Sequence, residues 1–136
     1  MNIKRFSLCS FVGFIFIFIY EYLIHGVLLV PTYELTPQLW RPMESMQEFM
    51  PIMTAVQLLT AAILCFIYTR HHEGKGISEG LRFGAMLGLL IGMLSFSSYA
   101  YMPISITLGL SWFGACFVKT IGLGVIFSLL YKNKKT

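Results

Sequence analysis

The stretch LRFGAMLGLLIGMLSFSSYAYM, residues 81–102, decides the fold class of this chain, and Arg82 is its only charged residue. An α-helix needs about 20 apolar residues to cross the roughly 30 Å hydrocarbon core of a membrane. Three further apolar runs, at residues 6–30, 51–68 and 108–131, suit the same role. The shortest, 51–68, is expected to extend outward through the residues before Pro51. We therefore predict one all-α transmembrane domain, residues 1–136, built as a four-helix bundle.

The composition excludes a soluble domain. Of the 136 residues 57% are hydrophobic and 12% are charged, and the mean hydropathy is +0.74, whereas about a quarter of the residues of a soluble domain are charged. A small domain also has too much surface to hide this apolar mass from water. The net charge of +4 would suit nucleic acid only on a soluble basic face. The expected partner is therefore the lipid bilayer, and no nucleic acid.

The distribution of lysine and arginine predicts the orientation. Cytoplasmic loops carry an excess of these residues, and here all the loop cations except Arg41 fall on one side. The cations on that side are Lys4, Arg5, Arg70, Lys75, Arg82, Lys132, Lys134 and Lys135. Both termini are therefore expected in the cytoplasm, with residues 31–50 outside.

The two longer loops carry local signals. Thr36 followed by Pro37 reads as an N-cap and a first helical residue, and Tyr33 and Trp40 suit the membrane interface. These residues predict a short interfacial helix outside, between the first and second spans. In the inner loop, Ser78 and Glu79 are placed to cap the third span and complement its dipole.

Four glycines recur every fourth residue in the third span, at Gly80, Gly84, Gly88 and Gly92. Small residues on one helix face let two membrane helices approach closely. This glycine ladder therefore predicts a close helix contact. The partner is either the fourth span, which offers Ser111, Gly114, Ala115, Gly122 and Gly124, or another subunit.

Ionisable residues inside the apolar runs predict a buried polar cluster. Glu21 lies toward the outer end of the first run, His25 follows it by one turn, and Lys119 lies within the fourth run. A charge at membrane depth costs about 2.5–3.5 kcal/mol and usually faces the bundle interior. Polar residues at a similar depth complete the candidate set, which is Glu21, His25, Gln57, Ser97, Ser98 and Lys119. A paired Glu and Lys hold each other charged, which favours a structural ion pair over a proton or substrate site.

Four methionines, Met43, Met46, Met50 and Met53, follow one another at spacings of three, four and three. On a helix they would form one stripe. Thioethers bind soft Cu(I), so a copper site is an alternative here. The pattern is more typical of a flexible apolar face that meets lipid or a partner, and we expect no metal.

Catalytic motifs are missing from the sequence. It contains no Asp, no HExxH, no GxSxG and no Walker-type loop. The three cysteines, Cys9, Cys65 and Cys116, lie in apolar runs without a CxxC pair, which argues against a redox or zinc motif. We expect a protein that is not an enzyme and needs no cofactor.

Several segments carry a resemblance to known proteins. They are HGVLLVPTY at residues 25–33, LWRP at 39–42, GKGISEGLRFGAMLGLLIG at 74–92 and PISITLGLSWF at 103–113. The chain resembles a group of small four-helix bacterial integral membrane proteins of uncharacterised function. The resemblance implies four helices and a bacterial inner membrane, but no activity. Lys119 departs from it, because the fourth helix of such proteins more often carries an acid there.

Two functions remain open from the sequence. The first is a non-enzymatic scaffold, accessory subunit or assembly partner that acts through helix packing, as a homo-oligomer or within a larger membrane complex. The alternative is a small proton- or ion-coupled transporter using Glu21, since small multidrug transporters are similar in having four helices and a membrane Glu in the first. The buried cation Lys119 would repel a cationic substrate, so transport is the second of the two hypotheses.

Overall fold

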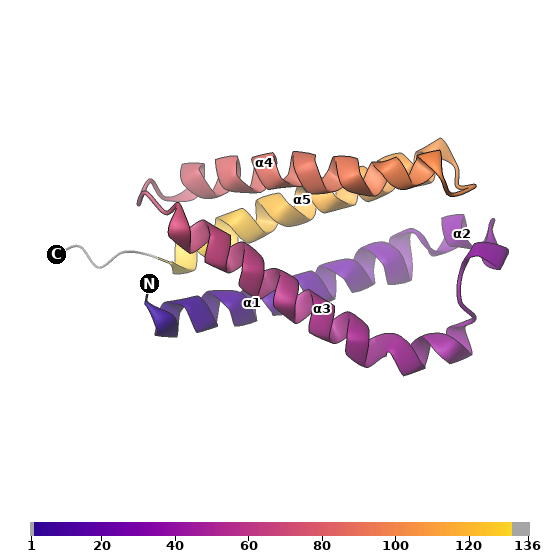
Figure 1. The fold of residues 1–136 in the computed structure, drawn as a ribbon, viewed down its shortest axis with the longest axis horizontal. Coiled ribbons are helices and arrows are strands. Elements are labelled where there is room, and N and C mark those ends of the chain that lie inside the picture. Colours follow the sequence, from indigo (N-terminus) through magenta and orange to yellow (C-terminus); the bar gives the residue numbers. More distant parts are fainter. Residues whose placement is uncertain (1, 132–136) are drawn as a thin grey trace.

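The computed structural model describes residues 2–131, and the regular structure in this part of the chain is entirely helical (Figure 1). Four segments are long and apolar enough to cross a membrane, which confirms the all-α fold with four long apolar helices. These segments are Ile3–Leu28, Met43–Arg70, Ile77–Ala100 and Ile106–Leu130. The second begins before Pro51, as the sequence predicted.

The elements follow one another as α1 (Ile3–Leu23), a π-helical turn η1 (Ile24–Leu28), α2 (Val30–Tyr33), a 3₁₀ turn η2 (Pro37–Leu39), α3 (Met43–Arg70), α4 (Ile77–Phe96), a 3₁₀ turn η3 (Ser97–Ala100) and α5 (Ile106–Leu130). The short helix expected between the first two spans is thus divided into α2 and η2. We call residues 29–40, which contain α2 and η2, the cap.

Of the two predicted helix caps, that of α4 is wrong and that of η2 is confirmed in position. The N-cap of α4 is Gly76, whose φ of 70° suits glycine, and no side chain caps this helix. The hydroxyl of Ser78 instead donates to the backbone oxygen of Lys75. Thr36 is the N-cap of η2 and Pro37 its first residue, but the Thr36 side chain makes no capping hydrogen bond. Glycine geometry therefore starts α4, and the fixed φ of Pro37 suits the start of η2.

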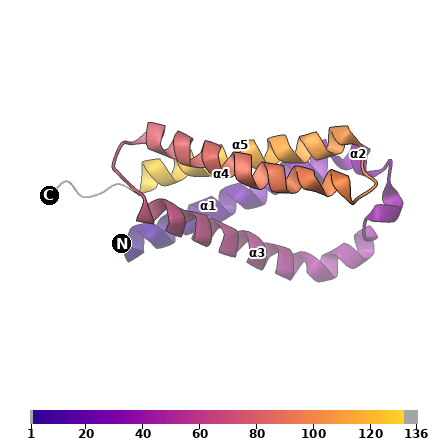
Figure 2. The same ribbon diagram turned by 45° about the horizontal axis from the view of Figure 1, so that its top comes forward.

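The helices form two pairs. α4 and α5 make the most extensive contact, and α1 packs on α3 and, less extensively, on α5. Figures 1 and 2 show α3 crossing α1 and diverging toward its Met43 end from the other long helices. The buried residues of α3 are Ala61, Leu64, Cys65 and Tyr68, all in its second half. The bundle is therefore closed at one end and open along α3 at the other.

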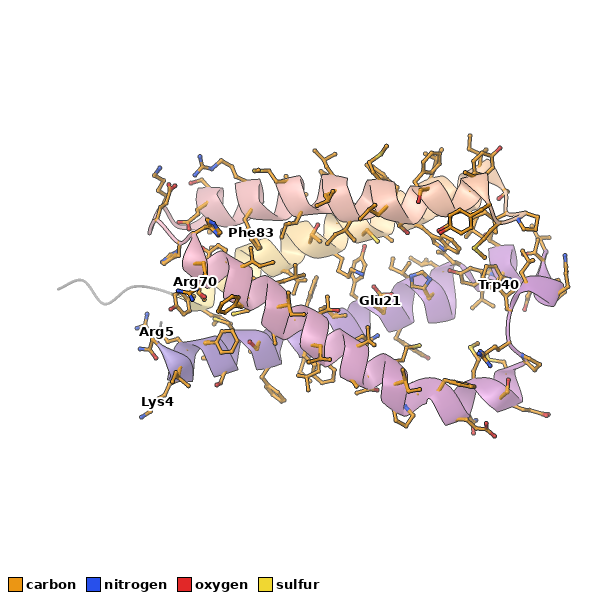
Figure 3. The ribbon with its side chains drawn as sticks, viewed as in Figure 1. Lys4, Arg5, Glu21, Trp40, Arg70 and Phe83 are labelled. Atoms are coloured by element: carbon orange, nitrogen blue, oxygen red, sulfur yellow. The ribbon has the colours of Figure 1, made fainter. Side chains whose placement is uncertain are left out.

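The two ends of the bundle differ in chemistry. Lys4, Arg5 and Arg70 lie together at one end, which we call the cationic end, and Trp40 lies at the other, which we call the tryptophan end (Figure 3). The core residues Cys9, Cys65, Tyr68, Leu123 and Phe127 belong to one buried cluster that joins α1, α3 and α5. Close packing is therefore concentrated in the half of the bundle that contains the cationic end.

Gly80, Gly84, Gly88 and Gly92 are all buried between α4 and α5. A Cβ atom built at Gly80 would lie 2.2 Å from the backbone oxygen of Gly124, and one at Gly84 would lie 2.5 Å from that of Thr120. Such distances leave no room for any side chain. The glycine face of α4 is therefore covered within the chain. Of the small residues considered as its partners, Gly124 makes the contact, whereas Gly122 faces Phe16 of α1 and Gly114 faces open space.

Candidate functional site

An ion pair between α1 and α5 forms the centre of the candidate site. Lys119 Nζ lies 2.5 Å from Glu21 Oε1, and the two side chains are 17% and 22% exposed. The stick view places Glu21 on the side of α1 that faces the other helices (Figure 3). A carboxylate and an ammonium partly removed from water stabilise each other's charged form. The pair therefore places two opposite charges side by side, so this partly buried site has no net charge.

His25 extends the ion pair toward the cap. Its Nε2 atom lies 3.2 Å from Glu21 Oε2, and its Nδ1 atom lies 2.5 Å from the hydroxyl of Tyr33. The His25 and Tyr33 rings also stack, with centroids 6.0 Å apart. His25 lies in the π-helical turn η1, and such turns are frequent at functional sites. The turn therefore carries the histidine that connects Glu21 to the cap.

Tyr33 joins the cap to α5 and, through His25, to the end of α1. The indole N–H of Trp112 on α5 donates to its hydroxyl oxygen at 2.9 Å, and the indole N–H of Trp40 donates to its backbone oxygen at 3.1 Å. Burial raises the pKa of the Tyr33 hydroxyl, the hydrogen bond from Trp112 opposes this shift, and the nearby charge of Glu21 adds to it. The hydroxyl therefore remains protonated and able to donate.

The hydrogen-bond donors and acceptors of this chain fit one arrangement. The Trp112 indole can only donate, so the Tyr33 oxygen accepts from it. Tyr33 O–H then donates to His25 Nδ1, and His25 Nε2–H donates to Glu21. A neutral imidazole has one donor and one acceptor nitrogen, so neutral His25 satisfies every partner. We call Glu21, His25, Tyr33, Trp112 and Lys119 the polar chain.

Three residues predicted for the polar cluster lie outside the polar chain. The Ser97 hydroxyl donates to the backbone oxygen of Leu94, and the Ser98 hydroxyl bonds to that of Tyr101. Both serines lie in η3, where nearby backbone and side-chain groups satisfy them. The Oε1 atom of Gln57 is buried, and no residue of the described chain bonds to it. The structure therefore brings Glu21, His25 and Lys119 together, whereas Ser97, Ser98 and Gln57 lie outside this group.

Residue spacing indicates the remaining members of the polar chain only in part. Tyr33 and Trp40 are interfacial aromatics by position, but nothing in their spacing indicates a hydrogen bond to Trp112, which lies 79 positions from Tyr33. Tyr20 was also missed, and its hydroxyl donates to the backbone oxygen of Ala115 at 3.0 Å. Beside this bond lies an apolar cavity of about 310 Å³, between η1 and α5, with Gly114 in its lining.

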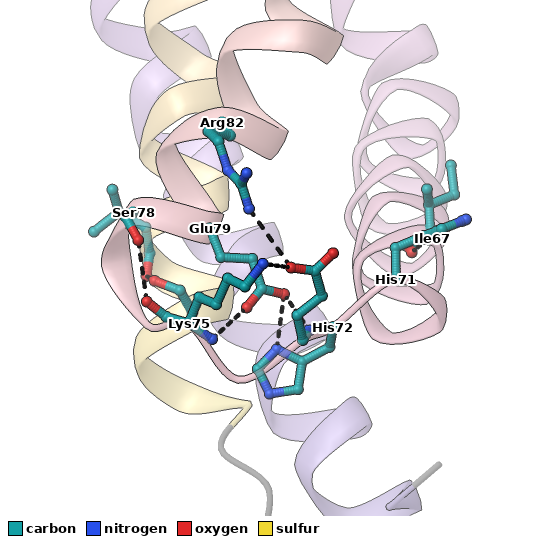
Figure 4. A network of polar contacts seen from close by, with 10 residues as sticks. Ile67, His71, His72, Lys75, Ser78, Glu79 and Arg82 are labelled. Atoms are coloured by element: carbon teal, nitrogen blue, oxygen red, sulfur yellow. Dashed lines mark hydrogen bonds and ion pairs between the residues drawn. The ribbon is translucent and has the colours of Figure 1, made fainter.

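A second polar network closes the cationic end of the bundle (Figure 4). Glu79 is 6% exposed. Its carboxylate accepts hydrogen bonds from the backbone N–H groups of Glu73 and Lys75, both at 2.8 Å. His72 Nδ1 lies 3.0 Å from the same carboxylate. We call this arrangement the Glu79 clamp, because one buried side chain holds the loop between α3 and α4 in place.

The exposed carboxylate of Glu73 balances the charges outside the clamp. It pairs with Lys75 and lies 3.7 Å from Arg82. The hydrogen bond and charge of Lys75 lower the pKa of Glu73. Beside the clamp lies a cavity of about 430 Å³ that is lined by both Tyr68 and Arg82. The loop charges are thus neutralised locally, and the cavity is left with mixed apolar and charged walls.

The methionine stripe lies on the exposed half of α3. Met43, Met46, Met50 and Met53 are 75%, 41%, 40% and 51% exposed. Within residues 2–131, no group of three or more His, Cys, Asp or Glu side chains could hold a metal ion.

Cys9 and Cys65 are both fully buried and their thiols interact with each other, so they act as part of the α1–α3 packing.

The chain matches no known protein family, no characterised protein and no solved structure. Its function therefore has to be inferred from the polar chain, the Glu79 clamp and the surfaces that the helices leave uncovered.

Proposed function

We propose that this chain is a non-enzymatic, multi-pass protein of a bacterial inner membrane that acts through helix packing. It would serve as a scaffold, an accessory subunit or an assembly partner in a larger complex. The observation that supports this role is the half of α3 nearest the tryptophan end, which lies away from the other long helices. The sequence resemblance to small four-helix bacterial membrane proteins supports the same membrane.

The uncovered half of α3 has an apolar surface. Large side chains such as Ile52 and Val56 are 60% and 55% exposed, and Met50 and Met53 are 40% and 51% exposed on the same helix. Flexible methionine side chains adapt to the shape of a partner. A partner helix that packs on this surface would therefore gain dispersion contacts and stabilise the assembly.

The glycine ladder does not supply this partner surface, because α5 already covers it. The partner is therefore expected on α3, and it is either a second copy of the chain or a different membrane protein. Either case accounts for a membrane-length helix whose buried residues are confined to its second half.

Photocrosslinking in native membranes tests this proposal. A photoreactive amino acid at Val56, which is 55% exposed, should give a protein adduct. The same group at Leu90 of α4, which is 58% exposed, is the matched control and should react only with lipid. Mass determination in mild detergent should find a second subunit or a co-purifying partner. A strictly monomeric protein with lipid adducts at both positions would overturn the proposal.

The proposed topology places the cationic end, and with it both termini, in the cytoplasm. The positive-inside rule supports this orientation. A cysteine at the exposed cap position Leu35 should react with a membrane-impermeant thiol reagent added to intact cells, whereas one at Lys75 should react only after permeabilisation. The reverse pattern would invert the assignment of every loop.

A second candidate function is proton- or ion-coupled transport, favoured by the contact of Glu21 with both His25 and Lys119. Ionisable groups inside membranes often mark ion pathways. Proteoliposomes containing the wild-type chain would then show flux driven by a proton gradient, and Glu21→Gln would abolish it. Equal flux in both preparations, or none in either, would reject this candidate.

A further inference from the structure

We propose that His25 is a proton-binding site that controls the attachment of the cap to α1 and α5. Three observations support this role of His25: the hydrogen-bond arrangement around it, the charges that surround it, and the position of the cap on the polar chain. The inference goes beyond the packing role proposed above and does not depend on the orientation of the chain in a membrane.

The attached state requires a neutral imidazole. Tyr33 O–H can donate to His25 Nδ1 at 2.5 Å only while that nitrogen carries no proton. The Tyr33 oxygen meanwhile accepts from Trp112. When His25 gains a proton, both ring nitrogens become donors, so Nδ1–H points at the Tyr33 oxygen, which already accepts from Trp112. The hydrogen bond reverses and the Tyr33 hydroxyl hydrogen loses its acceptor. An unsatisfied hydroxyl in a partly buried site destabilises the attached cap.

The charged groups around His25 lie on two elements. Glu21, one turn earlier on α1, attracts a histidine cation. Lys119 on α5 already pairs with the same carboxylate and repels a second cation. From the cap, Tyr33 is the titratable side chain that contacts the ring. The Glu21 charge is therefore shared between two cations after protonation, so it compensates only in part for the Tyr33 hydroxyl hydrogen that has lost its acceptor.

The consequence is confined to the cap because Tyr33 bridges two helices through one hydroxyl oxygen. Its contacts with His25 and Trp112 tie residues 29–40 to α1 and α5. Trp40 adds a ring contact with Trp112 at 6.2 Å between centroids. Protonation of His25 turns the Tyr33 hydroxyl from donor to acceptor in the first contact, while the same oxygen still accepts from Trp112, so the hydroxyl hydrogen is left without an acceptor. Acid is therefore expected to release the cap, and neutral pH to restore it.

Intrinsic fluorescence tests this inference, because the two tryptophans of the chain, Trp40 and Trp112, both lie at the cap. The wild-type protein in detergent micelles is titrated from pH 8 to pH 5, the range in which histidine changes charge. We expect a reversible shift of the emission maximum to longer wavelength as the indoles meet water. Hydrogen exchange of residues 29–40, corrected for its intrinsic pH dependence, should accelerate over the same pH range.

Variants assign the transition to His25. His25→Gln retains a donor for Glu21 and an acceptor for Tyr33, so it should hold the cap and remove the transition. Tyr33→Phe should give fast exchange of the cap at every pH. His71→Gln, at the exposed start of the inner loop, is the matched control and should keep the wild-type transition.

Two outcomes would overturn the inference. One is a wild-type chain whose cap exchanges equally fast at pH 8 and pH 5, which is a measurement that no variant can confound. The other is a His25→Gln protein that is folded and keeps the wild-type transition.

Discussion

Lys119 and Glu21 are 98 residues apart in the chain, yet their charged groups meet at 2.5 Å between α5 and α1. This relationship joins the hairpin of α4 and α5 to the first helix. It also fixes the position of His25, which shares the Glu21 carboxylate. The ion pair is thus both a connection between helices and the base of the polar chain.

Removing either charge should destabilise the bundle more than removing both. Breaking a buried pair costs about 3–5 kcal/mol in soluble proteins, because one charge is left uncompensated. We expect Glu21→Gln and Lys119→Met each to lower the melting temperature, and the double variant to recover much of the loss. Thermal melts in one detergent provide the measurement. Additive losses in the double variant would show that the two side chains act independently.

Two glycine-to-alanine substitutions should have opposite effects. At Gly84 a Cβ would lie 2.6 Å from the Ile121 Cα atom, whereas at Gly114 nothing lies within 4 Å. Overpacking a filled contact costs about 1–3 kcal/mol, so Gly84→Ala should lower the melting temperature. Gly114→Ala should raise it slightly, because alanine is favoured over glycine in a helix by roughly 0.5–1 kcal/mol. Equal tolerance of both substitutions would contradict the close packing of α4 on α5.

The Glu79 clamp should be far more sensitive than the neighbouring exposed pair. Glu79→Gln leaves one oxygen where two accepted the backbone N–H groups of Glu73 and Lys75. Unsatisfied buried groups cost about 1–3 kcal/mol. Proteolysis or hydrogen exchange of residues 71–76 should therefore increase in this variant. Glu73→Gln removes only exposed ion pairs and serves as the control, with little expected change.

Native cysteines provide a test of the α1–α3 contact. The thiols of Cys9 and Cys65 interact inside the core, so a membrane-permeant oxidant such as iodine should join them with the loss of two hydrogens. Mass spectrometry of the intact chain would detect this intramolecular disulfide. Cys65→Ser should prevent it, and Cys116→Ser should not. A chain that stays fully reduced under conditions that oxidise an exposed cysteine would place α1 and α3 differently.

The sequence was most informative where one physical rule decides the outcome. Twenty or so apolar residues can only be accommodated in a few ways, so four long helices followed from run length alone. Helix ends were less predictable. The first run was expected to be one helix, yet it widens into a π-helical turn at Ile24–Leu28. His25 lies in this turn and contacts Tyr33 of the cap, and no local pattern in the sequence marks the change.

The polar site was predictable in its charges and not in its hydrogen bonds. Glu21 and Lys119 stand out because each is a charge within an apolar run, so the need for a partner is visible in the sequence. Ser97 and Ser98 fall at a suitable depth, but hydroxyl groups near a helix end readily bond to neighbours. Tyr33 and Trp112 join the site through the folded path of the cap, which residue spacing does not reveal.

The close contact between α4 and α5 also has a bearing on biogenesis. Synthesis proceeds from the N-terminus, so α4 is made before the helix that covers its glycine face. Until α5 has formed, that face is open to any other small-faced helix nearby. A chain interrupted before residue 106 would keep the glycine face uncovered. The formation of α5 is thus the step that commits the α4 surface to its own chain.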